Sequence, residues 1–193
     1  MFVKRVNDMK VMLTSCGLET EEIKSCFMDL FDSDPKDIRA LFIPTAAIDP
    51  GAVSVLPKCM NDLLKCEIPD GNVIVFDLHR NMEYDELKGY DVVYLCGGSP
   101  SYLLERVNDS GFSEALARFV KEDGIVLGVS AGSMIFSADL ENNLGLVNTE
   151  LYVHCASGEK AGRIEYPFTK NIALSNTQAL IIRSPDDVLI IGE

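Results

Sequence analysis

The stretch Ile125-Val126-Leu127-Gly128-Val129-Ser130-Ala131-Gly132 decides the fold of this chain. An apolar run ends at a serine between two glycines, and a helix is expected to begin near Ala131. A serine at such a strand-to-helix turn projects its hydroxyl from the end of the sheet, while the next backbone N–H points to a developing oxyanion. Any Cβ at Gly128 or Gly132 would crowd the neighbouring strand or helix. The G-x-S-x-G pattern therefore predicts a nucleophile elbow with Ser130 at its apex.

Apolar runs and segments of helical period alternate before this stretch, which is typical of a parallel sheet covered by helices. We predict strands at residues 10–14, 39–43, 72–76, 92–96 and 125–129, and helices at 21–31, 53–66, 101–107 and 112–122. Thr20 and Ser113 are expected to cap two of these helices. The predicted fold class is α/β, with an open, mostly parallel sheet and helices on both faces. In such a sheet the carboxyl ends of the strands form the ligand crevice.

The pattern changes after the elbow. Short strands, some of them antiparallel, are expected at residues 143–147, 150–154, 171–175, 179–183 and 187–191. Residues 155–168 have weak periodicity and two glycines, and we interpret them as a loop at the edge of the site. Because no repeat or linker interrupts the pattern, we expect a single domain over residues 10–193, preceded by a short extension at residues 1–9.

Length and composition narrow the class of protein. The chain has 193 residues, 47% of them apolar and 24% charged, as in a soluble globular protein. No apolar run approaches the about 20 residues that span a bilayer. The first residues, Met1-Phe2-Val3-Lys4-Arg5, lack the apolar core of a secretion signal. We therefore expect a cytoplasmic protein with no membrane partner.

The net charge and the spacing of possible metal ligands exclude further classes of protein. The formal net charge of −13 would repel a phosphate backbone, so no nucleic-acid partner is expected. The six cysteines form no C-x-x-C pairs, which indicates reduced thiols that serve as small apolar residues. The two histidines are far apart and no ligands cluster in the sequence, so we predict neither a metal site nor a cofactor.

A serine nucleophile needs a base, and histidine is the usual one. The chain offers two. His79 follows the strand expected at 72–76, and we interpret it as a surface loop residue. His154 follows Ser130 in the sequence and ends an expected strand, which makes it the better candidate base. The alternative for His154 is a structural or surface role.

The turn Gly97-Gly98 lies between an expected strand and an expected helix. Paired glycines let a backbone N–H approach a ligand closely, so the Gly98 N–H is expected to form an oxyanion hole with that of Ala131. The alternative is an ordinary strand-to-helix turn. The G-x-G-x-x-G spacing of a dinucleotide site is absent.

Five ordered motifs together resemble one known family. They are Leu13-Thr14-Ser15-Cys16-Gly17-Leu18, Phe42-Ile43-Pro44-Thr45-Ala46-Ala47, Gly97-Gly98-Ser99 with Tyr102-Leu103-Leu104, Gly128-Val129-Ser130-Ala131-Gly132-Ser133, and Leu144-Gly145-Leu146-Val147 with His154. The combination resembles the peptidase E family of serine dipeptidases, which are related to cyanophycinases and have a class I glutamine amidotransferase-like fold. The resemblance extends from about residue 10 to the C-terminus.

The resemblance implies that Ser130 is the nucleophile, that His154 is the general base and acid, and that the N–H groups of Gly98 and Ala131 bind the oxyanion. It further implies hydrolysis of dipeptides or other very small peptides through an acyl-enzyme. Peptidase E prefers dipeptides that begin with aspartate. The expected partner is a small peptide substrate, and the expected assembly is a monomer or a small homo-oligomer.

Further site residues follow from the same resemblance. The acid that orients His154 is expected between Ser130 and His154, where Asp139 is the first candidate and Glu141 the alternative. Arg163 is the candidate cation for a substrate carboxylate, and its alternative is a solvated loop arginine. The family commonly has asparagine where this chain has Ser99, so substrate contacts at this position are expected to differ.

Other functions stay open on the sequence alone. The chain could be a degenerate member that binds a small ligand or partner without turnover. It could also be another hydrolase or an amide transferase of the same fold, although glutamine amidotransferases have cysteine at the position of Ser130. An α/β-hydrolase would normally have its histidine near the C-terminus, and no histidine follows His154.

Overall fold

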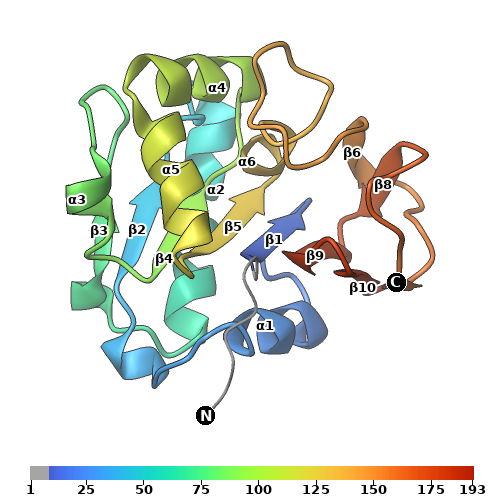
Figure 1. Cartoon of the computed structure of the whole chain (residues 1–193). Helices are drawn as coiled ribbons and strands as arrows, with labels where there is room; N and C mark the ends of the chain where they lie inside the picture. Colours follow the sequence, from blue (N-terminus) through green and yellow to red (C-terminus); the bar gives the residue numbers. More distant parts are fainter. Residues whose placement is uncertain (1–8) are drawn as a thin grey trace.

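The computed structural model describes residues 9–193 (Figure 1). The expectations for the extension at 1–9 and for a missing secretion signal fall on residues 1–8, outside the described part, apart from Met9. The elements are β1 (Lys10–Thr14), α1 (Glu21–Met28), β2 (Ala40–Ile43), α2 (Pro50–Lys65), β3 (Val73–Val75), α3 (Tyr84–Leu87), β4 (Val92–Leu95), α4 (Pro100–Asp109), α5 (Phe112–Lys121), β5 (Ile125–Val129), α6 (Ala131–Met134), β6 (Leu151–Cys155), β7 (Gly162–Arg163), β8 (Ile172–Ser175), β9 (Ala179–Ser184) and β10 (Asp187–Ile191), with 3₁₀ turns at Pro35–Asp37 and Asp70–Asn72.

An eight-stranded sheet in the order β3-β2-β4-β5-β1-β9-β10-β7 forms the centre of the molecule. The strands from β3 to β1 pair in parallel, whereas β9, β10 and β7 add to the sheet in antiparallel pairs. This arrangement confirms the predicted α/β class, including the antiparallel strands near the C-terminus. The carboxyl ends of β2, β4, β5 and β1 point to one edge of the sheet, where a crevice is expected.

The alternation of side chains along each strand divides the core into two layers. On β1, Val11 and Leu13 face the layer that contains the apolar residues of α4 and α5. Met12 faces the opposite layer, which contains the buried faces of α1 and α2. Because β2, β4 and β5 are buried on both faces, their sequences are almost continuously apolar, whereas Ile74 and Val75 of the edge strand β3 are exposed. Helices lie on both faces of this part of the sheet (Figure 1).

Strands β6 and β8 form a separate two-stranded parallel sheet. Both lie beyond the antiparallel strands at one side of the main sheet (Figure 1). Their register pairs Leu151 with Ile172 at the start and Cys155 with Ser175 at the end, with an irregularity after Tyr152. Because the two strands are parallel, the residues at their carboxyl ends are neighbours.

The glycines that flank Ser130 are required by close backbone approaches. A Cβ on Gly128 would lie 2.6 Å from the carbonyl oxygen of Gly132, and a Cβ on Gly132 would lie 2.2 Å from the carbonyl oxygen of Leu95. Ser133, which is fully buried, donates its hydroxyl to the backbone carbonyls of Thr14 and Gly128 and accepts a bond from the Thr14 N–H. The strand-to-helix turn is therefore fixed against both β1 and β4.

Gly132→Ala is expected to lower the free energy of unfolding by about 1–3 kcal/mol, since its Cβ would meet the backbone of Leu95, which cannot rotate away. Gly71→Ala is the matched control because a Cβ there has no atom within 4 Å. Its effect should stay within about 0.5 kcal/mol. Urea denaturation of the two variants measures the difference, and equal stabilities would contradict the packing described for the turn.

The structure corrects three expectations about secondary structure. Residues 143–147 form a loop with a single bridge between Ser137 and Val147, because the Asn143 side chain bonds the N–H of Gly145 and the carbonyl of Leu140. The cap residue of α5 is Gly111 at φ 71°, and Ser113 lies inside the helix. The loop expected at 155–168 contains the two-residue strand β7, which pairs with β10.

The expectation that Thr20 caps a helix is confirmed. The Thr20 hydroxyl accepts a bond from the N–H of Ile23 and caps α1. All six cysteines are free thiols. Within residues 9–193, no helix is both long and apolar enough to cross a membrane.

Candidate active site

Ser130 occupies a strained turn at the carboxyl end of β5. Its φ of 51° and ψ of −109° form a conformation that side-chain-bearing residues rarely adopt. Its N–H donates to the carbonyl of Thr14, which fixes the turn to β1. The turn after β4 packs against the Ser130 side chain. A Cβ on Gly97 would lie 3.2 Å from the Ser130 Cβ and 3.7 Å from its Oγ. The hydroxyl is thus held at the crevice edge of the sheet.

His154 reaches this hydroxyl from β6. Its Nε2 lies 2.9 Å from Ser130 Oγ, a hydrogen-bond distance. The His154 backbone has a φ of 59°, so the irregularity in β6 falls at the residue that contacts Ser130. The hydroxyl of Ser15, in the turn after β1, accepts a bond from the His154 N–H and donates to the carbonyl of Leu174 in β8. Ser15 therefore holds both strands of the small sheet.

Asn176 contacts the other nitrogen of the imidazole ring. Its Oδ1 lies 2.9 Å from His154 Nδ1. With an oxygen facing Nδ1, the neutral ring carries its proton on Nδ1, and Nε2 is free to accept a bond from the Ser130 hydroxyl. Asn176 directly follows β8, and His154 is near the end of β6, so the parallel pairing of these strands brings the two residues together.

The sequence analysis did not identify Asn176, although a signal existed. It follows the strand predicted at residues 171–175 as a polar residue, just as Ser15 follows the strand predicted at residues 10–14. The expectation of a carboxylate between Ser130 and His154 leaves Asn176 out on both counts, because Asn176 is an amide and follows His154.

The two carboxylates expected to orient His154 lie elsewhere. Asp139 accepts bonds from the Ser137 hydroxyl, at 2.7 Å, and from the Leu151 N–H, at 2.9 Å. These bonds tie the segment after α6 to the first residue of β6. Glu141 is exposed in the turn that follows. The expectation for Asp139 and Glu141 is corrected, because the partner of His154 Nδ1 is the amide of Asn176.

The residues expected at the oxyanion hole are Ala131, which directly follows Ser130, and Gly98, which directly follows the Gly97 that lies against the Ser130 side chain. Ala131 begins α6, so its N–H is among those that a helix leaves without an internal partner. Gly98 has a φ of 140°, and a Cβ there would lie 2.0 Å from the carbonyl oxygen of Ala46. Only glycine fits this close approach. The Ser99 hydroxyl caps α4 by accepting a bond from the Tyr102 N–H at 3.4 Å; its substrate contact stays a prediction.

A buried carboxylate supports the turn after β1. Asp62 is only 4% exposed, and its Oδ2 accepts bonds from the Leu18 N–H and the Tyr94 hydroxyl at 3.2 and 2.8 Å. Burial raises the pKa of the Asp62 carboxyl. The same turn carries Cys16, whose Sγ lies 3.6 Å from His154 Nδ1. Burial raises the pKa of this thiol as well, so it is protonated at neutral pH.

Arg163 lies in β7 and is bound to the protein. Its guanidinium donates to the carbonyl of Asp186 at 2.7 Å and pairs with the Asp187 carboxylate at 3.2 Å. To bind a substrate carboxylate, Arg163 would have to exchange the ion pair with Asp187. Its role in substrate binding stays a prediction.

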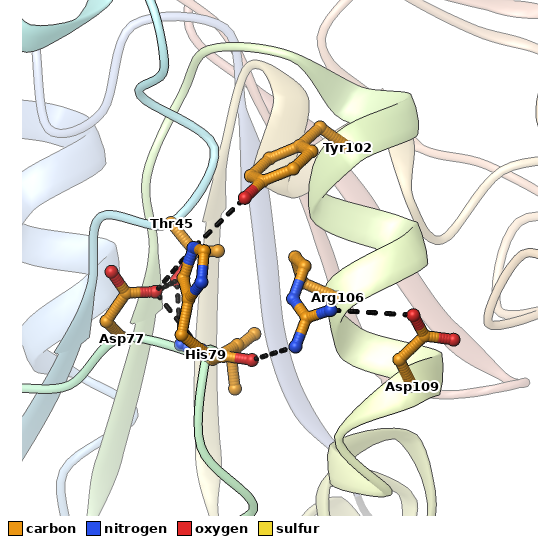
Figure 2. A network of polar contacts seen from close by, with 7 residues as sticks. Thr45, Asp77, His79, Tyr102, Arg106 and Asp109 are labelled. Atoms are coloured by element: carbon orange, nitrogen blue, oxygen red, sulfur yellow. Dashed lines mark hydrogen bonds and ion pairs between the residues drawn. The ribbon is translucent and has the colours of Figure 1, made fainter.

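His79 belongs to a different polar network (Figure 2). Its Nε2 lies 3.0 Å from the Tyr102 hydroxyl and 3.7 Å from the Asp77 carboxylate, and its side chain is 61% exposed. The Thr45 hydroxyl donates to the Asp77 carboxylate at 3.1 Å, while Arg106 donates to the carbonyl of Leu78. This agrees with the interpretation of His79 as a residue of a surface loop.

Comparison with known proteins relates the chain to a family. The sequence profile described as peptidase family S51 matches residues 11–152, which include Ser130 but end before His154 and Asn176. No curated protein sequence matches the chain significantly.

Two solved structures are similar in fold. One is a candidate peptidase E protein from Listeria monocytogenes EGD-e, with 20% identity and a TM-score of 0.68 over 96% of this chain and 99% of that one. The other is a peptidase from an acI-B1 actinobacterium, with 17% identity and a TM-score of 0.67 over 97% of this chain and 89% of that one. The family profile covers most of the chain and the fold agrees along nearly its whole length. The chain therefore belongs to peptidase family S51 and is a serine peptidase.

Proposed function

We propose that this peptidase hydrolyses dipeptides or other very small peptides through an acyl-enzyme on Ser130. The observation that carries the proposal is the continuous set of contacts from Ser130 Oγ to His154 Nε2 and from His154 Nδ1 to Asn176 Oδ1, each 2.9 Å long. Nucleophile, base and orienting group lie in the order that serine hydrolysis requires.

In the proposed reaction, His154 Nε2 takes the Ser130 proton while Oγ attacks the peptide carbonyl. The N–H groups of Gly98 and Ala131 stabilise the oxyanion. His154 then protonates the leaving amine, and a water molecule activated by the same ring hydrolyses the acyl-enzyme. Asn176 keeps the proton of the resting ring on Nδ1. As a neutral amide it stabilises the imidazolium less than a carboxylate would, so its main contribution is to orient the ring.

The alternative of a binding protein without turnover would be favoured by a serine and histidine too far apart to interact. The observed Ser130–His154 distance instead favours the peptidase. An amide transferase is less favoured because a serine stands at the elbow.

A dipeptide panel with acidic, neutral and basic first residues tests the proposal and identifies the side-chain preference. We expect amino acids to be released from at least one class, with no cleavage of a folded protein substrate. If Arg163 binds an acidic side chain, Arg163→Met will raise KM for dipeptides that begin with aspartate and leave neutral dipeptides unaffected. Liquid chromatography of the products measures both, and turnover by Ser130→Ala equal to that of the wild type would contradict the mechanism.

A further inference from the structure

Three potential metal ligands converge on one side of the His154 ring, opposite Ser130. His154 Nδ1 lies 3.6 Å from the Cys16 Sγ and 2.9 Å from the Asn176 Oδ1. Ser130 contacts Nε2, at the other end of the ring. Cys16 comes from the turn after β1, and Asn176 from the turn after β8. The sequence could not predict this cluster, because Cys16 and His154 are 138 residues apart.

The separation of sulfur and nitrogen matches that of two ligands on one zinc ion. Zinc binds thiolate sulfur at about 2.3 Å and imidazole nitrogen at about 2.0–2.1 Å in tetrahedral geometry, which places the two ligand atoms about 3.5 Å apart. An ion could therefore enter between Cys16 and His154 with little movement of either side chain. The Asn176 oxygen is close enough to Nδ1 to become a third, weaker ligand after a small shift.

The cluster is accessible from solvent. His154 and Asn176 are exposed, and Cys16 is half-buried. The chain is strongly acidic, with a formal net charge of −13, which raises the local concentration of cations. Among residues 9–193, no group of three histidine, cysteine or acidic side chains could hold a metal ion. The cluster at His154 has two strong ligands, and we expect zinc to bind to it reversibly.

We propose that Zn²⁺ binds between Cys16 Sγ and His154 Nδ1, with Asn176 Oδ1 as an additional ligand, and inhibits the peptidase. The Cys16 thiol releases its proton to solvent as the zinc–sulfur bond forms. Metal on Nδ1 displaces the proton from this nitrogen and leaves the neutral ring protonated on Nε2. An Nε2–H group donates a hydrogen bond to Ser130 Oγ and cannot take its proton. Zinc thus imposes the tautomer opposite to the one that Asn176 favours. The inhibition, but not the binding, rests on the function proposed for Ser130 and His154.

The binding step is tested without any peptide substrate. Co²⁺ is added to the purified, chelator-treated protein, and a thiolate-to-cobalt absorption band in the near ultraviolet reports coordination by sulfur. We expect one such ion per chain, displaced by Zn²⁺, in the wild type and in Ser130→Ala. Cys16→Ser should abolish the band and weaken Zn²⁺ affinity by at least about 10-fold, measured by calorimetry.

Two variants serve as controls for other sites. Cys26→Ser removes a half-buried thiol on α1 and should leave the band unchanged. His79→Gln removes the imidazole beside Asp77, which could hold zinc without a thiol, and should also leave the band unchanged. A cobalt band that persists in Cys16→Ser, or no band in the wild type, would overturn the proposed site.

The inhibition step uses the dipeptide that the panel identifies. Zn²⁺ should inhibit the wild type and Cys26→Ser equally, and EDTA should restore their activity. The zinc concentration for half-inhibition should rise at least about 10-fold in Cys16→Ser, relative to the activity of that variant without zinc. If the thiolate-bound metal forms but activity is unchanged, the tautomer mechanism is wrong. If no dipeptide is cleaved at all, the proposed function fails while the cobalt experiment still decides the metal site.

Discussion

Ser130→Ala is expected to lower kcat/KM for small peptides by about 10⁴- to 10⁶-fold, the loss seen when a serine peptidase loses its nucleophile. The hydroxyl is the attacking group in the proposed reaction, and it makes the hydrogen bond to His154. Alanine has the same backbone restriction as serine at a φ of 51°, so the turn strain is retained. The free energy of unfolding should therefore change little.

Steady-state kinetics on the best dipeptide and urea denaturation measure these two effects. Ser113→Ala, inside α5, is the matched control and should keep full activity. Because nucleophile and base act as a unit, Ser130→Ala combined with His154→Ala should be no less active than Ser130→Ala alone. A further large loss in the double variant would show that His154 acts independently of Ser130.

Asn176→Leu is expected to lower kcat by about 10²- to 10⁴-fold with little change in KM, because the leucine removes the acceptor that keeps the His154 proton on Nδ1. Asn176→Asp should rescue activity, since a carboxylate oxygen accepts the same bond and also stabilises the imidazolium. A merely structural role for Asn176 would predict similar losses in both variants.

The pH profile of kcat/KM separates these roles further. A carboxylate beside the ring favours its protonated form, so the acidic limb of the profile should move to higher pH in Asn176→Asp. Asn81→Leu changes an exposed asparagine in the loop after β3 and provides the control. An Asn176→Leu variant with wild-type kcat would mean that the ring needs no acceptor on Nδ1.

Much of the main sheet could be predicted because its sequence signals are local. The predicted bounds of β1 and β5 agree with the structure, and the close approaches at Gly128 and Gly132 are those expected from the G-x-S-x-G pattern. A buried parallel strand is a continuous apolar run that ends at turn-forming residues. Such a signal depends little on contacts with residues that are distant in the sequence.

The part of the site that follows Ser130 in the sequence could not be predicted, because it depends on tertiary contacts. Leu144 and Leu146 give residues 143–147 an alternating pattern, but Asn143 bonds the local backbone and holds the segment as a loop. Asn176 faces His154 only because β6 and β8 pair in parallel, and nothing in the sequence between them fixes that register. The expected acid, Asp139, is instead used to hold the start of β6. The contacts that polar residues make in this region depend on how the strands pair, and the sequence pattern alone does not determine that pairing.

The site consists of two parts that are held by different contacts. The His154–Asn176 pair belongs to the small sheet, and Ser130 belongs to the main sheet. The angle between the His154 ring and the Asn176 amide is set within β6 and β8, whereas the distance from the ring to Ser130 is set where Ser15 docks the small sheet on β1. Substitutions at this docking contact will therefore change the reach of the base without altering which nitrogen bears the proton. Substrate preference can diverge among such proteins by remodelling one part, while the nucleophile and its turn stay as they are.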